Sequence, residues 1–293
     1  MEKDYAYWQP NIGGKLGGAL KVIKLHHAPL VEGPALLGAF IYSVPSARIL
    51  LLVLAAAFSV HVFGETYNEL VGIKWHLNDP IKRPFVAGTL TVPEGYMLVL
   101  AGVAGLEISA YLLNRWALFL SPLVVLAALI YPHLKDKTAA STYVLSAIVS
   151  MGILGGYVAV FGGMPFEADF LLHAPWLFAL SGLFFTAYFD EVANLPNLEL
   201  HKKVGLAEFS AVKSSNFTLR FITLNGIAYL GFALAGCFAY SVGPVAVFLA
   251  LASAVVWAVA RSLVKAGNYG KAVDRSLIAW LILVCGVIIS RLI

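Results

Sequence analysis

Residues that could do chemistry gather at the end of a long apolar run over about residues 47–72. Two carboxylates, an amide and an imidazole share one face of the helix expected there: Glu65, Asn68, Glu69 and His76. Ionisable groups are costly at membrane depth and are functional candidates wherever they occur there. The pattern therefore favours a polar site over an ordinary solvated helix end.

A second polar cluster ends the apolar run at 172–190. Asp190 and Asn194 are one helical turn apart, and His201 and Lys202 follow them closely. Taken alone, this cluster is equally consistent with the start of a polar loop. Four apolar runs separate the two clusters, which places both at the same side of a membrane.

Both clusters combine carboxylates at a helix end with nearby cations. Carboxylate and amide oxygens are the ligands that Mg²⁺ prefers, and bound Mg²⁺ holds anionic phosphate groups. Lys82 and Arg83 follow the first cluster, where they could neutralise the remaining phosphate charge. The two clusters therefore predict one metal-assisted site for a substrate with an anionic leaving group.

The elements that must position these clusters are membrane helices. The chain has 293 residues, of which 60% are hydrophobic and 12% charged, and its mean hydropathy is +0.83. That composition excludes a soluble enzyme, and no Ser-His-Asp set or nucleic-acid-binding surface is evident. Nine apolar runs are long enough to span a membrane: 20–43, 47–72, 95–113, 115–132, 141–161, 172–190, 217–240, 243–263 and 276–291.

The positions of the cations predict the orientation. With a cytoplasmic N-terminus, all but three of the 20 Lys and Arg residues fall on the cytoplasmic side, the exceptions being Arg48, Arg115 and Arg291. The positive-inside rule then places the C-terminus on the opposite side and both polar clusters at the cytoplasmic side. No linker or soluble segment is evident, so residues 1–293 are expected to form one all-α domain, a bundle around a central cavity.

Three stretches carry a resemblance to a known family. The first is Asn68-Glu69-Leu70-Val71-Gly72, continued through His76 to Asn78-Asp79-Pro80-Ile81-Lys82-Arg83-Pro84. The second is Asp190-Glu191-Val192-Ala193-Asn194, and the third is Tyr131-Pro132-His133-Leu134-Lys135. They resemble the motifs of the UbiA superfamily of intramembrane prenyltransferases, in which Asp-rich sequences follow the second and sixth of nine helices. The resemblance covers nearly the whole chain.

The resemblance implies transfer of an isoprenoid chain from a prenyl diphosphate to an aromatic or lipid acceptor within the bilayer. It implies that Glu69 and Asp190 are catalytic and that they bind Mg²⁺ together with Asn68 and Asn194. The residues that it implies for substrate binding come from all three stretches and their flanks: Asn68, His76, Lys82, Arg83, Lys135, Asn194, His201 and Lys202.

The departures from the family motifs leave alternatives open. Glu69, Gly72 and His76 stand where the first motif has three aspartates, and Asn194 stands where the second has an acid. The sequence therefore leaves three alternatives open for the metal: fewer Mg²⁺ ions than in the family, a different metal, or no metal. A membrane terpene cyclase of the same superfamily and a non-catalytic protein that binds an isoprenoid or a quinone remain alternative functions.

Overall fold

The computed structural model describes residues 13–77, 83–162 and 172–293, apart from the side chain of His76. Within these ranges the chain forms helices and no strands, which confirms the predicted all-α class. The α-helices are α1 (Gly14–Ile23), α2 (Ala28–Phe40), α3 (Ala47–His76), α4 (Val92–Leu113), α5 (Arg115–Ile130), α6 (Ser141–Phe161), α8 (Trp176–Asn194), α9 (Leu198–Lys203), α10 (Phe209–Val212), α11 (Ser215–Ala239), α12 (Pro244–Lys265) and α13 (Tyr269–Leu292). Three 3₁₀ turns connect them: η2 (Leu25–His27), η3 (Tyr131–Leu134) and η4 (Leu195–Asn197).

Polar residues at the apolar boundaries start the long helices where the sequence leads us to expect them. Ser46 accepts a hydrogen bond from the backbone N–H of Ile49 at the start of α3. Thr91 and Glu94 form a reciprocal capping box at the start of α4. Asn114 separates α4 from α5 and accepts hydrogen bonds from the first N–H groups of α5. These caps turn one long apolar stretch into two helices.

Seven helices in the described ranges are long and apolar enough to cross a membrane. They are α3, α4, α5 with η3, α6, α11, α12 and α13, and each coincides with one of the expected apolar runs. The other two expected runs overlap α2, which has 13 residues, and α8, which has 19 residues and carries Asp190 and Glu191 in its last turns. The count is therefore seven and not the expected nine, because α2 is short and the charges of α8 lower its hydropathy.

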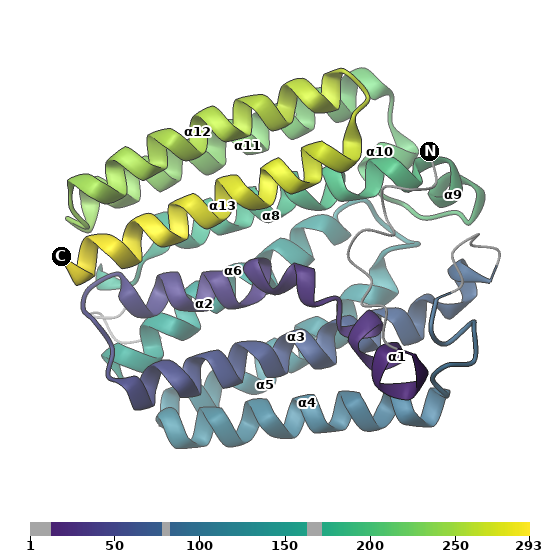
Figure 1. Ribbon diagram of the computed structural model, residues 1–293, viewed down its shortest axis with the longest axis horizontal. Helices are drawn as coiled ribbons and strands as arrows, with labels where there is room; N and C mark the ends of the chain where they lie inside the picture. Colours follow the sequence, from purple (N-terminus) through teal and green to yellow (C-terminus); the bar gives the residue numbers. More distant parts are fainter. Residues whose placement is uncertain (1–12, 78–82, 163–171) are drawn as a thin grey trace.

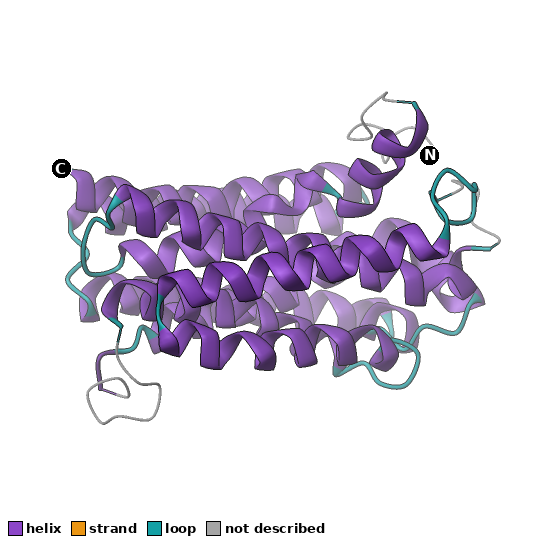
Figure 2. Ribbon diagram, turned by 90° about the horizontal axis from the view of Figure 1, so that it is seen from below, coloured by secondary structure: helices purple, strands orange, loops and turns teal. Residues whose placement is uncertain are grey.

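The long helices lie side by side along one axis, and the chain turns at the two ends of the bundle (Figures 1 and 2). At one end α3 and α8 finish close to the short helices α1, α9 and α10 (Figure 1). Arg48, Arg115 and Arg291 belong to the start of α3, the start of α5 and the end of α13, which lie at the other end. The arrangement therefore brings the ends of both predicted motif helices to one end of the bundle.

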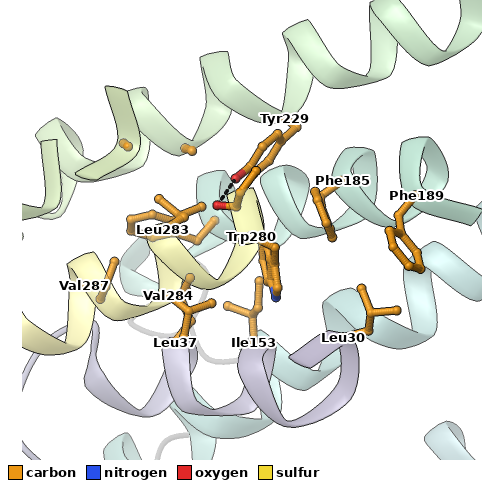
Figure 3. Close-up of a cluster of buried hydrophobic side chains, with 14 of the residues drawn as sticks. Leu30, Leu37, Ile153, Phe185, Phe189, Tyr229, Trp280, Leu283, Val284 and Val287 are labelled. Carbon is orange, nitrogen blue, oxygen red and sulfur yellow. Dashed lines mark hydrogen bonds between the residues drawn. The ribbon is translucent and has the colours of Figure 1, made fainter. Parts of the chain in front are cut away.

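The larger apolar core lies where α2, α6, α8, α11 and α13 meet (Figure 3). The Trp280 ring of α13 stacks on Phe185 of α8, with ring centroids 4.8 Å apart, and both are fully buried. Helices α2 and α6 cross closely at Gly38. A Cβ atom added there would lie 1.9 Å from the carbonyl oxygen of Ile153. Small residues permit such crossings in membrane proteins. A second core around Phe63 joins α3 to α4, α5 and α6.

Candidate functional site

A cavity of about 1570 Å³ extends between the two cores. Its apolar walls come from α4, α5 and α6 and include Leu106, Leu120 and Ile148. Polar groups line it near the ends of α3 and α8. Seven of the ten predicted site residues are among the lining residues: Asn68, Glu69, Arg83, Lys135, Asp190, Asn194 and His201. The fold thus brings both sequence clusters to one cavity.

The carboxylates at the end of α3 are held by side-chain cations. Glu65 and Glu69 lie one turn apart on the cavity face of α3. The Lys24 ammonium lies 2.9 Å from Glu65 Oε2 and 2.7 Å from Glu69 Oε1. His27 Nδ1 lies 2.8 Å from Glu65 Oε1, and the Arg83 guanidinium also donates to Glu69. The first motif is therefore a carboxylate pair in a network of ion pairs.

The backbone explains how Lys24 reaches this position. Lys24 ends α1 in the left-handed region, with φ 53° and ψ 59°, and its N–H donates to the carbonyl of Leu20. The chain then makes the single turn η2 and enters α2, with Pro29 in its first turn. This sharp corner places Lys24 and His27 against the end of α3.

The carboxylate at the end of α8 has neutral hydrogen-bond donors. Asp190 accepts a hydrogen bond from Thr142 Oγ1 of α6 at 2.7 Å. Asn194, one turn later on α8, donates from Nδ2 to Asp190 Oδ1 at 3.4 Å. Lys135, in the turn after η3, lines the same part of the cavity. Asp190 thus faces the cavity without a side-chain cation among its hydrogen-bond partners in the described residues.

The neighbouring carboxylate, Glu191, has a structural role. It is fully buried and accepts hydrogen bonds from the N–H groups of Phe209 and Ser210, at 3.2 and 3.0 Å. These N–H groups belong to the first turn of the short helix α10, so Glu191 satisfies donors that would otherwise have no partner. Asp190 and Glu191 both contact the Thr142 hydroxyl, at 2.7 and 3.4 Å, but of the two only Glu191 accepts from α10 and only Asp190 lines the cavity.

The remaining predicted site residues have varied positions. His201 is buried, and its Nδ1 lies 2.6 Å from Glu208 Oε2. Lys202 pairs with Glu199 on the exposed surface of α9, at 3.2 Å. Lys82 and the side chain of His76 lie outside the described residues. Lys202 is thus not among the residues that line the cavity, and its role in substrate binding stays a prediction.

The two motifs differ in how well they fit a Mg²⁺ ion. Mg²⁺ usually keeps several waters and binds one or two carboxylates together with substrate phosphates. Asp190, with Asn194 beside it, fits one such ion. At the end of α3, the Lys24 ammonium already lies between the two carboxylates, so their donor set does not fit. Among the described residues, no three His, Cys, Asp or Glu side chains are grouped to hold a metal.

Sequence reasoning missed the contributions of Lys24, His27 and Thr142. The first two lie inside the first apolar run, 20–43. A lysine beside two histidines inside a predicted span was the signal that could have revealed a cation directed at the site. Thr142 carried no signal, because a hydroxyl on an apolar helix is common.

Comparisons with known proteins agree with this architecture. The model of the UbiA prenyltransferase family matches residues 33–284. The chain is 26% identical over 196 residues to a 4-hydroxybenzoate octaprenyltransferase of Stutzerimonas stutzeri (strain A1501), an alignment that covers 66% of this chain and 63% of that protein. The chain thus spans less than two thirds of the length of the first curated relatives that it matches.

Solved structures show the same fold. The apo structure of a UbiA homolog from Aeropyrum pernix K1 has a TM-score of 0.83 at 26% identity, covering 90% of this chain and 98% of that chain. A UbiA homolog from Archaeoglobus fulgidus bound to DMAPP and Mg²⁺ has a TM-score of 0.67 at 13% identity, covering 91% and 99%. At that identity the second likeness supports the fold alone.

Proposed function

The chain belongs to the UbiA prenyltransferase family, and we propose that it transfers an isoprenoid chain from a prenyl diphosphate to an aromatic or lipid acceptor within the membrane. The observation that carries the proposal is the single cavity that joins apolar walls to the ends of α3 and α8. Its volume exceeds the usual 300–1,000 Å³ of small-molecule sites. A long apolar chain with an anionic head fits such a space.

The cavity residues have distinct roles in the proposed reaction. The bond between the allylic carbon and the diphosphate oxygen breaks, which leaves negative charge on the diphosphate and positive charge on the carbon. Arg83 and Lys135 neutralise the diphosphate, and the planar guanidinium of Arg83 can donate to Glu69 and to a phosphate together. The acceptor then attacks the allylic carbon and loses a proton.

Asp190 and Asn194 would hold one Mg²⁺ ion, which when bound supplies positive charge to the leaving diphosphate. Thr142 orients the Asp190 carboxylate through its 2.7 Å hydrogen bond. Glu69 positions Arg83 at the cavity. The apolar walls exclude water, which would otherwise capture the allylic cation. In this proposal catalysis depends on position and electrostatics.

We further propose nine membrane segments, with α2 and α8 completing the set, around a central cavity. The N-terminus and the site loops would be cytoplasmic. The support is that Arg48, Arg115 and Arg291 lie at the end of the bundle away from the site. Thiol labelling of single-cysteine variants in sealed inverted vesicles tests this topology. The outer face of these vesicles is the cytoplasmic one, so an impermeant reagent should label a cysteine at residue 88, and protection of that cysteine would contradict the topology.

A non-catalytic protein that binds an isoprenoid or a quinone is a second candidate. The ion pairs of Glu65 and Glu69 favour it, because carboxylates engaged by protein cations are poor metal ligands. This alternative predicts tight lipid binding without release of diphosphate.

Product analysis distinguishes the candidates. Purified protein in nanodiscs is incubated with radiolabelled geranylgeranyl diphosphate and Mg²⁺, with or without 4-hydroxybenzoate or a glycerophosphate acceptor. The proposal predicts that diphosphate release depends on an acceptor and that a prenylated product appears in mass spectra. Release without any acceptor, with a cyclic hydrocarbon product, would indicate a cyclase. Binding without release in every condition would indicate the non-catalytic alternative.

A further inference from the structure

A cation of the protein itself, Lys24, lies against the carboxylates at the end of α3. We propose that the Lys24 ammonium replaces one divalent metal ion at the end of α3 and binds the substrate diphosphate directly. The inference rests on the proposed function, since it concerns the same diphosphate site. It adds that this half of the site works without metal.

The contacts of Lys24 carry the proposal. Its Nζ lies 2.9 Å from Glu65 Oε2 and 2.7 Å from Glu69 Oε1, so it occupies the space between two carboxylates one turn apart. An ammonium has three N–H donors. Within the described residues these two carboxylates use two of them, and Lys24 lines the cavity. The third donor is thus available to a phosphate oxygen at the cavity end.

The charge balance supports the same conclusion. Glu65 and Glu69 contribute two negative charges, and Lys24 and Arg83 contribute two positive charges. Two carboxylates with one divalent ion would have the same net charge of zero. A divalent ion that displaced the ammonium from these carboxylates would exchange one positive charge for two, and would leave the ion, both carboxylates and Arg83 with a net charge of +1. The covalently attached cations make that ion unnecessary.

The backbone at Lys24 supports a specific role for its side chain. A non-glycine residue with φ 53° is uncommon and is disfavoured relative to glycine, because its Cβ crowds the backbone. Glycine is the usual residue where a helix ends in this conformation. The chain has lysine there, with its side chain directed at the carboxylates. Lys24→Gly is consequently a variant that removes the ammonium and relieves the backbone.

The test measures binding of inorganic diphosphate and of Mn²⁺ to the full chain in nanodiscs. Calorimetry gives diphosphate affinity in EDTA and in Mg²⁺, and electron paramagnetic resonance counts bound Mn²⁺ in the presence of diphosphate. The parent protein should bind diphosphate in EDTA and should hold a single Mn²⁺, at Asp190. Lys24→Gly should bind diphosphate at least about tenfold more weakly in EDTA, because a charge-assisted hydrogen bond is lost.

Added metal should rescue that variant. With Mg²⁺ present, Lys24→Gly should regain affinity near that of the parent, and it should bind a second Mn²⁺ between Glu65 and Glu69. Lys24→Met, which keeps the side-chain length, should behave in the same way. Lys15→Ala is the matched control, because Lys15 is also on α1 and also pairs with a carboxylate of another helix, Glu94, away from the cavity. It should match the parent in both measurements.

Two results would overturn the inference and separate it from the proposed function. If the parent needs Mg²⁺ to bind diphosphate and holds two Mn²⁺, while Lys24→Gly is unchanged, then Lys24 does not replace an ion, although prenyl transfer can still stand. If the parent binds no diphosphate in EDTA or in Mg²⁺, the inference fails together with the proposed function.

Discussion

The ends of α3 and α8 line the same cavity, but their carboxylates have different kinds of partner. At the end of α3, Glu65 and Glu69 are paired with Lys24 and His27 from the corner between α1 and α2, and with Arg83 from the segment after α3. At the end of α8, Asp190 has the neutral donors Thr142 and Asn194. In the proposed function, the end of α3 uses cations attached to the chain, whereas the end of α8 has a carboxylate that would hold a metal ion.

Removing the accessible carboxylate should have the largest effect. We expect Asp190→Asn to lower the rate of diphosphate release at least about 100-fold, because the group that would hold the metal against the leaving diphosphate loses its charge. Release of radiolabelled diphosphate under saturating prenyl diphosphate measures it. Glu199→Gln changes an exposed carboxylate of the same region and serves as the control. An Asp190→Asn protein with the parent rate would remove Asp190 from the chemistry.

The end of α3 should be more tolerant, because several cations share the anionic charge there. We expect Arg83→Lys to lower kcat/KM about tenfold, since lysine cannot contact Glu69 and a phosphate with the fixed geometry of a guanidinium. Steady-state kinetics across prenyl diphosphate concentrations give the value. An unchanged kcat/KM would mean that Arg83 holds Glu69 but does not touch the substrate.

The sequence predicted where the site lies better than how it is built. Charged residues at the ends of apolar runs located Glu69, Asp190 and Arg83, because such residues are rare at membrane depth and must face a polar space. The separate roles of Asp190 and Glu191 were not predictable. Adjacent residues on a helix point about 100° apart, and the packing of α6 and α10 decides which of them faces the cavity.

The position of Lys24 was unpredictable for a related reason. Its contact with the end of α3 depends on a left-handed residue and on the single turn η2, and neither has a clear signature in the sequence. The long helices were predicted closely because apolar length is a strong signal. The shorter α2 was expected as a full span because α1, η2 and α2 together form one apolar run.

Exchanging the buried carboxylate beside Asp190 should change stability more than chemistry. We expect Glu191→Gln to lower the unfolding free energy by about 1–3 kcal/mol, because the N–H groups of Phe209 and Ser210 donate to different oxygens of Glu191 and an amide offers only one acceptor oxygen. Chemical unfolding in mild detergent, followed by tryptophan fluorescence, measures the loss. Diphosphate affinity should change much less than stability, because Glu191 is not among the residues that line the cavity. A stable protein that has lost diphosphate binding would assign Glu191 to the site.

The smallest effect on stability is expected for an ammonium–carboxylate pair that lies outside the cavity. Lys74 donates to Asp136 at 2.7 Å on the surface, and this hydrogen bond lowers the pKa of the Asp136 carboxyl. Because the folded pKa is lowered, the stabilisation is present above the unfolded value near 4 and is lost as pH falls through the folded pKa. A double-mutant cycle with Lys74→Ala and Asp136→Asn should give a coupling below about 1 kcal/mol at pH 7. A larger coupling energy would show that this pair stabilises the fold more than an exposed ion pair does.

The central claim is that the two differently built motifs hold one diphosphate between them. A structure of the protein in nanodiscs with a geranyl thiolodiphosphate, whose sulfur prevents cleavage, tests it most directly. We expect the diphosphate between Arg83 on one side and Asp190 and Lys135 on the other, with the hydrocarbon chain in the cavity along Leu106 and Ile148. Diphosphate density outside the space between α3 and α8, or a hydrocarbon chain lying on the outer surface of the bundle, would contradict it.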